Sequence, residues 1–237
     1  MSMPERIPQQ IQWKFYRAKQ HYDELRDVLR EYWKSTPVKL NKDPHTPDGY
    51  IVQSETDPPA RFGLIAGDFL QNVRSCLDYL VWQLVIANGE TPNRVNQFPV
   101  CDSTGKWKEN MERNRLAGVH PDAVDLIRSF QPCFDEESTT APHPLSVLEE
   151  LVNENKHRQV LFTAIALGQF PSVRPPVAFA EYQVTRMRDG KEVPGERLVA
   201  FLTFKGGIAH KLEVVSALEI VSNFIGYDML PQFEKFF

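Results

Sequence analysis

Apolar residues recur every three or four positions along two long stretches of this chain, and this spacing restricts its fold more than any other feature. The first stretch carries Ile11, Phe15, Ala18, Tyr22, Leu25, Leu29 and Tyr32. The second carries Phe62, Ile65, Phe69, Val73, Leu77, Leu80 and Leu84. Such spacing places all the apolar side chains on one face of a helix, so both stretches are predicted to be amphipathic helices.

Weaker patterns complete the predicted architecture. Helices of a bundle are expected at about 9–34, 58–88, 144–168 and 216–230. Ser216 and Glu219 have the spacing of a capping box at the start of the last one. Residues 171–213 are rich in β-branched and aromatic side chains, which favours a small antiparallel sheet inserted before that helix. We therefore expect an α+β fold, mainly a helical bundle, in a single domain spanning 1–237.

Shorter elements are expected between these segments. The extended stretches VKLN and GYIVQSE flank the turn-rich DPHTPDG, which predicts an exposed hairpin. Two short helices are expected around Trp107 to Leu116 and Asp122 to Phe130.

Composition and charge narrow the classes of function. A formal net charge of -4 and a pI near 5.9 argue against a protein coated with phosphate-binding charge, so a nucleic-acid site would have to be a local patch. Neither a membrane-spanning run nor a signal peptide is apparent, so we expect a cytoplasmic protein with no membrane association. Histidine and cysteine spacing indicates neither a metal site nor a cofactor. The four tryptophans are expected to be core and interface aromatics.

Two clusters of polar residues interrupt apolar helical segments. The first cluster is Asp68, Asn72, Arg74, Asp78 and Tyr79. The second cluster is Asn153, Asn155, Lys156, His157 and Arg158. Charged and amide groups within a core helix lose hydration, so they persist when paired, hydrogen-bonded or used by a ligand. The two clusters therefore suggest one shared polar site.

Two interpretations of these clusters stay open. Histidine titrates near neutrality and arginine binds phosphate in a bidentate manner, so Arg74, His157 and Arg158 are candidate catalytic residues. The other residues of the two clusters would then bind the ligand or support the catalytic residues. Alternatively, Arg74 pairs with Asp78, and Asp78 or Asp68 satisfies Arg158, so that the polar groups only lock two helices together.

Several separated motifs agree in order with a widespread set of uncharacterised bacterial proteins. The segment GDFLQNVRSCLDYLVWQL is followed by FPV, by QP and by PLSVLEELVNENKHR. The usual pattern of those proteins reads Gly-Asp, Asn-Leu-Arg-Ser-Ala-Leu-Asp-His, Phe-Pro-Ile and Asp-Lys-His-Arg. The resemblance covers most of residues 60–165 and carries no established activity with it.

The first cluster also resembles the HEPN superfamily of helical proteins. Many of those proteins are metal-independent RNases that use an arginine followed, after four to six residues, by a histidine. Arg74 matches the arginine, whereas Tyr79 stands where the histidine is expected, and a phenol is a poor general base near neutral pH. The resemblance implies an RNA- or nucleotide-directed protein with a degenerate nuclease-like site, and a homodimer, because HEPN sites are commonly shared between two protomers.

The sequence therefore leaves two hypotheses. The leading one is an HEPN-like protein that acts on or binds RNA or a nucleotide through the two clusters. The alternative is a non-enzymatic module that binds a protein partner and whose polar clusters are structural. The sequence does not decide between these hypotheses, so whether the chain is an enzyme stays open.

Overall fold

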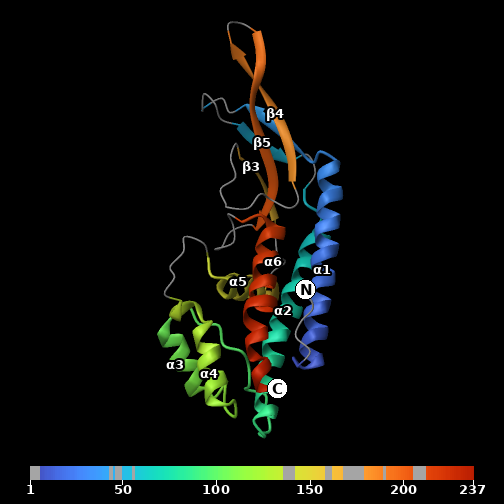
Figure 1. Cartoon of the computed structure of the whole chain (residues 1–237). Coiled ribbons are helices and arrows are strands. Elements are labelled where there is room, and N and C mark those ends of the chain that lie inside the picture. Colours follow the sequence, from blue (N-terminus) through green and yellow to red (C-terminus); the bar gives the residue numbers. More distant parts are fainter. Residues whose placement is uncertain are drawn as a thin grey trace. The chain divides into compact units, whose positions relative to one another are not determined.

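The structure, a computed structural model, describes residues 6–42, 45, 50–54, 57–135, 142–157, 162–167, 179–188, 191–204 and 212–237. Its α-helices are α1 (Gln9–Lys34), α2 (Ala60–Ala87), α3 (Thr104–Glu112), α4 (Pro121–Ser129), α5 (Pro144–His157) and α6 (Val214–Asn223). Its strands are β1 (Val38–Lys42), β2 (Tyr50–Ser54), β3 (Phe162–Leu167), β4 (Phe179–Arg188) and β5 (Lys191–Phe204). Short 3-10 and π segments follow α4 and α6: η1 (Pro132–Phe134), η2 (Phe224–Met229) and η3 (Leu230–Phe236) (Figure 1).

The chain divides into two compact units. The helical unit comprises Met1–His21, Gly67–Arg158 and Glu219–Phe237, and the strand-containing unit comprises Tyr22–Ala66 and Gln159–Leu218. The boundary between them passes through α1, α2 and α6 along the sequence. The α+β, mainly helical fold class is confirmed, whereas the single domain over 1–237 stays a prediction.

The two strongest sequence patterns correspond to the two longest helices. The expected spans 9–34 and 58–88 correspond to α1 and α2. Phe69, Val73 and Leu77 are fully buried, as the stripe of α2 requires. No helix in the part of the chain that the structure describes is both long enough and apolar enough to span a bilayer.

The third helix is shorter than predicted. The span 144–168 was expected to be helical throughout, but α5 ends at His157 and Phe162–Leu167 forms β3. The mainly apolar segment Phe162–Leu167 pairs with β5, from Phe162 opposite Phe204 to Leu167 opposite Val199. A short apolar run fits helix and strand equally well by spacing alone, and pairing with the distant β5 decides the outcome here.

The predicted sheet and hairpin are both present. β5 lies between β3 and β4 in a three-stranded antiparallel sheet, so the sheet begins before the expected span 171–213. The dipeptide Asp189-Gly190 also favours a tight turn by its sequence, but these two residues lie outside the described residues. β1 and β2 pair antiparallel, from Val38 opposite Ser54 to Lys42 opposite Tyr50. The two short helices expected around Trp107 and Asp122 are α3 and α4.

The last helix begins earlier than the capping box predicts. Glu213, and not Ser216, caps α6, because its carboxylate accepts the backbone N–H groups of Val215 at 3.0 Å and Ser216 at 2.7 Å. The hydroxyl of Ser216 donates to the same carboxylate at 2.8 Å. A carboxylate on the first free N–H groups also suits the positive end of the helix dipole. The helix was expected to end near residue 230. The α-helix itself ends at Asn223, and the π segment η2 continues it to Met229.

Within the helical unit, η2 packs closely on α1 at a glycine. A Cβ placed on Gly226 would lie 2.8 Å from Cε1 of Phe15 and closer still to Cζ. Real Cβ atoms do not approach a ring so closely, and Phe15 is itself buried in the core. The absence of a side chain at residue 226 is therefore what lets these two segments pack.

We expect Gly226→Ala to lower the free energy of unfolding by about 1 to 3 kcal/mol, because it overpacks this contact. Denaturant unfolding measures the change. Gly105→Ala is the matched control, since a Cβ on Gly105 of α3 meets nothing nearer than 4.0 Å and alanine favours helix. Combining Gly226→Ala with Phe15→Leu should cost less than the sum of the two single changes. A fully additive double variant would contradict the proposed overlap.

Candidate functional site

Arg74 lies at the centre of the first polar cluster and is held by groups of the protein itself. Its side chain is only 11% exposed on α2. One guanidinium nitrogen, Nη2, donates to the backbone oxygen of Phe98 at 2.6 Å and to Oδ1 of Asp78 at 3.2 Å. The other, Nη1, donates to Oε2 of Glu149 on α5 at 3.4 Å. The arginine thus ties α2 to α5 and to the extended segment at Phe98.

Asp78 and Arg74 together hydrogen-bond both backbone groups of Phe98. Its Oδ1 accepts the backbone N–H of Phe98 at 3.0 Å, while Arg74 binds the backbone oxygen of Phe98. Arg74 and Asp78 stand four residues apart, so one face of α2 presents a donor and an acceptor together. The side chain of Phe98 is fully buried, and its polar backbone groups are thereby satisfied. We call Arg74, Asp78, Glu149 and Phe98 the arginine clamp.

Part of the second polar cluster also contacts this region of α2. Asn153 donates to Oε1 of Glu149 at 3.4 Å, so the amide steadies the carboxylate that receives Arg74. A Cβ on Gly67 would lie 2.9 Å from Cγ of Asn155. Glycine at residue 67 therefore leaves room for the side chain of Asn155 against α2.

The remaining predicted site residues are dispersed or fall outside the description. Asp68 is exposed, and its backbone oxygen accepts the side-chain amide of Asn72 at 2.8 Å. Lys156 is exposed near the end of α5. His157 is the last residue of α5 and its side chain is not described, and Arg158 lies outside the described residues. The predicted meeting of Arg74 with His157 and Arg158 stays a prediction.

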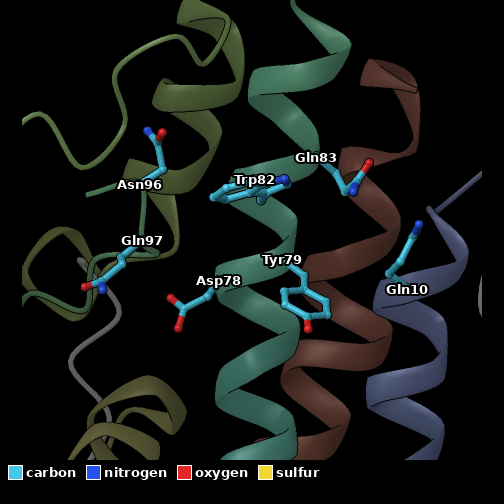
Figure 2. A pocket seen from close by; sticks show the side chains of 7 residues that line it. All are labelled: Gln10, Asp78, Tyr79, Trp82, Gln83, Asn96 and Gln97. Carbon is cyan, nitrogen blue, oxygen red and sulfur yellow. The ribbon is translucent and has the colours of Figure 1, made fainter. Parts of the chain in front are cut away.

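Next to the clamp, α2 contributes to an open pocket of about 480 Å³. Its lining residues are Gln10, Asp78, Tyr79, Trp82, Gln83, Asn96 and Gln97. Figure 2 shows Trp82 lying across α2, with Asn96 and Gln97 on one side of this helix and Gln10 on the other. Tyr79 and Trp82 are 41% and 40% exposed. The ammonium of Lys14 lies over the Tyr79 ring, 5.9 Å from its centre. Two partly exposed aromatic side chains therefore line the pocket.

Some polar atoms of the pocket already make hydrogen bonds within the protein, and others do not. The amide of Asn96 is fully engaged, because it donates to Arg115 and Ala117 and accepts the N–H of Asn93. Asp78 offers Oδ2, which has no hydrogen bond to any residue that the structure describes. The amides of Gln10 and Gln83 likewise make no side-chain hydrogen bond within the described part of the chain. A carboxylate oxygen and two amides can therefore serve a ligand.

Thiol chemistry is disfavoured by the environment of the cysteines. Burial raises the pKa of the Cys101 thiol to about 11, and burial raises the pKa of Cys76 further. Both thiols are protonated at neutral pH, whereas a cysteine nucleophile must be a thiolate. Among the described residues, no three His, Cys, Asp or Glu side chains gather as a metal site.

Sequence reasoning missed several residues of this region. Glu149 and the backbone of Phe98 belong to the clamp, and neither was predicted as part of the site. Of the tryptophans expected to be core or interface aromatics, Trp33 is buried, whereas Trp13 and Trp82 are exposed, so an interface role for these two stays a prediction. The Phe-Pro-Val motif was the one signal that could have pointed to Phe98.

Comparison with protein-family models, with curated proteins and with solved structures gives no match for this chain. The likeness to the uncharacterised bacterial proteins and to the HEPN superfamily therefore stays a hypothesis.

The substitution Arg74→Ala removes the hydrogen-bond donors of two carboxylates and of the backbone oxygen of Phe98. We expect it to lower the free energy of unfolding by about 3 kcal/mol. This is the lower end of the range for breaking a buried pair, since Asp78 and Glu149 are 35% and 36% exposed. Arg74→Lys keeps the positive charge but loses the several donors of the planar guanidinium, so it should lower the free energy of unfolding by an intermediate amount. Urea denaturation measures both.

Lys34→Ala is the control for removing one cation. Lys34 pairs with Glu31 at 2.5 Å, but both side chains are 70% exposed, so the loss should stay below about 1 kcal/mol. Equal losses for Arg74→Ala and Lys34→Ala would show that the clamp does not hold the fold together.

Proposed function

We propose that this protein binds a nucleotide or single-stranded RNA without cleaving it, with the base held in the pocket beside the arginine clamp. The observation that carries the proposal is that one pocket holds two partly exposed aromatic residues, Tyr79 and Trp82, and the Oδ2 atom of Asp78, which has no partner among the described residues. Aromatic faces stack on bases, and polar edges read their hydrogen-bonding groups.

The chemistry of the pocket favours a base that carries hydrogen-bond donors. An ionised carboxylate only accepts hydrogen bonds, so Oδ2 of Asp78 suits a ring N–H or an amino group. Guanine presents both side by side on its Watson–Crick edge. The amides of Gln10 and Gln83 can donate and accept, so they complement the remaining edges of a base. We therefore expect guanosine to bind more tightly than uridine.

The arginine clamp favours binding over catalysis. A catalytic arginine must direct its donors at the substrate, whereas the donors of Arg74 are directed at Phe98, Asp78 and Glu149. Tyr79 is exposed in the pocket, where its ring serves stacking better than its phenol serves proton transfer near neutral pH. In this proposal Arg74 is structural, whereas Asp78 and Tyr79 of the same cluster serve the ligand together with Trp82 on α2.

A second candidate is self-association through the same face of α2. Tyr79, Trp82 and Ile86 follow one another at helical spacing, and their exposed fractions are 41%, 40% and 46%. Such an apolar strip can cover the equivalent strip of a second copy of this chain. Sedimentation separates the two functions, because only self-association predicts a dimer that Trp82→Ala converts to monomer.

We expect Trp82→Ala to weaken guanosine binding by about 1 to 3 kcal/mol, or roughly 5- to 150-fold, through loss of base stacking. Isothermal titration calorimetry with guanosine, and with a short single-stranded oligoribonucleotide, measures the change. Trp13→Ala is the matched control, because Trp13 is 62% exposed on α1 but does not line the pocket.

Three results would overturn this proposal. One is a wild-type protein that binds neither guanosine nor the oligoribonucleotide. Another is equal weakening by Trp13→Ala and Trp82→Ala, which would indicate general surface contact. The third is cleavage of the oligoribonucleotide by the wild type that is lost in Arg74→Lys, which would restore the catalytic interpretation of the clamp.

A further inference from the structure

Three arginines gather at a second pocket of the helical unit. Arg94, Arg113 and Arg115, with Val95 and Gln97, line a pocket of about 350 Å³. The chain as a whole carries a net charge of -4, so three cations around one small pocket form a local exception. Guanidinium groups are the side chains best suited to bidentate binding of phosphate.

The protein leaves much of this charge without a partner. Arg94 is exposed and makes no hydrogen bond or ion pair with any residue that the structure describes. Arg115 donates through Nη1 to Oε1 of Gln97, yet its buried Nε has no acceptor within the described part of the chain. Arg113 pairs with Glu109 at 2.5 Å, but both side chains are more than half exposed, at 63% and 54%, so a phosphate can displace this surface pair.

Backbone hydrogen bonds fix the segments that carry these arginines. The N–H of Gln97 donates to the backbone oxygen of Arg115 at 3.2 Å, and the amide of Asn96 donates to the same oxygen at 3.3 Å. The clamp then holds the next residue, Phe98, to α2. The arginine pocket therefore has a prearranged backbone, which reduces the entropy lost when a ligand binds.

The two pockets adjoin, because Gln97 lines both of them. One pocket offers aromatic rings and a carboxylate oxygen, and the other offers guanidinium groups. This order of apolar and cationic surfaces matches the order of base and phosphate in a nucleotide.

We infer that Arg94, Arg113 and Arg115 form the phosphate subsite for a nucleoside phosphate whose base lies against Tyr79 and Trp82. This inference rests on the proposed function, since it places the phosphate relative to a base bound in the neighbouring pocket. The phosphate belongs either to a free nucleotide or to a strand of RNA, and the recognised chemistry is the same.

The test compares guanosine with guanosine 5′-monophosphate by isothermal titration calorimetry. For the wild type we expect the monophosphate to bind about tenfold more tightly, because charge-assisted hydrogen bonds to phosphate are gained. The Arg94→Gln, Arg113→Gln double variant should bind both ligands within about twofold of each other and should show a weaker dependence on salt. A guanosine-containing oligoribonucleotide with a 5′-hydroxyl distinguishes strand phosphate from the free nucleotide.

Lys108→Gln is the matched control, because it removes a cation that is 81% exposed on α3 and does not line the pocket. It should keep the tenfold preference. Thermal melts confirm that the double variant is folded.

The outcomes separate the two proposals. Equal binding of guanosine and its monophosphate by the wild type overturns the phosphate subsite and leaves the base pocket standing. A preference for the monophosphate that survives in the double variant, or that Lys108→Gln also abolishes, overturns the subsite as well. If neither ligand binds, both proposals fall.

Discussion

The arginine clamp is the interaction on which the arrangement of the helical unit depends. Arg74 reaches groups that lie 4, 24 and 75 positions away along the chain, in Asp78, Phe98 and Glu149. Burying a guanidinium is unfavourable unless its donors find acceptors, so these three partners must be in place at once. The clamp therefore specifies how α2, α5 and the segment at Phe98 fit together, more than it adds net stability. An apolar residue of similar size would fill the space without selecting those partners.

The same clamp positions the candidate ligand site. Asp78 uses Oδ1 for Arg74 and Phe98, which fixes the orientation of its carboxylate and leaves Oδ2 without a partner among the described residues. Phe98 in turn restrains its neighbour Gln97, which lines both the aromatic pocket and the arginine pocket. The engaged amide of Asn96 ties this segment to Arg115 and Ala117. Binding groups held in this way lose little conformational freedom when a ligand arrives.

Features that depend on interactions between residues close in sequence could be predicted, whereas features that depend on residues far apart in sequence could not. α1 and α2 were predictable because their apolar stripes repeat over many turns, and the Arg74–Asp78 pair was predictable from its spacing of four. The strand at Phe162–Leu167 was mistaken for helix because pairing with β5, about 40 residues away, decides its conformation. Phe98 was missed as a clamp residue because its contribution comes from backbone atoms, which every residue type has. The arginine pocket was missed because only the fold brings Arg94 and Arg113 to the same pocket.

Asp78 is the one residue that belongs to both the clamp and the pocket, and this has a thermodynamic consequence under the proposed function. A base that donates to Oδ2 binds the same carboxylate whose Oδ1 accepts from Arg74 and Phe98. Binding and folding are then linked, because a ligand that favours the clamped orientation of Asp78 stabilises the native state by mass action. The linkage is reciprocal, so a substitution of Arg74 that releases this orientation of Asp78 is expected to weaken ligand binding, even though Arg74 does not line the pocket. A loss of binding on substitution of Arg74 is therefore expected from a structural residue and is not by itself a sign of catalysis. Only a product of RNA cleavage separates the two roles.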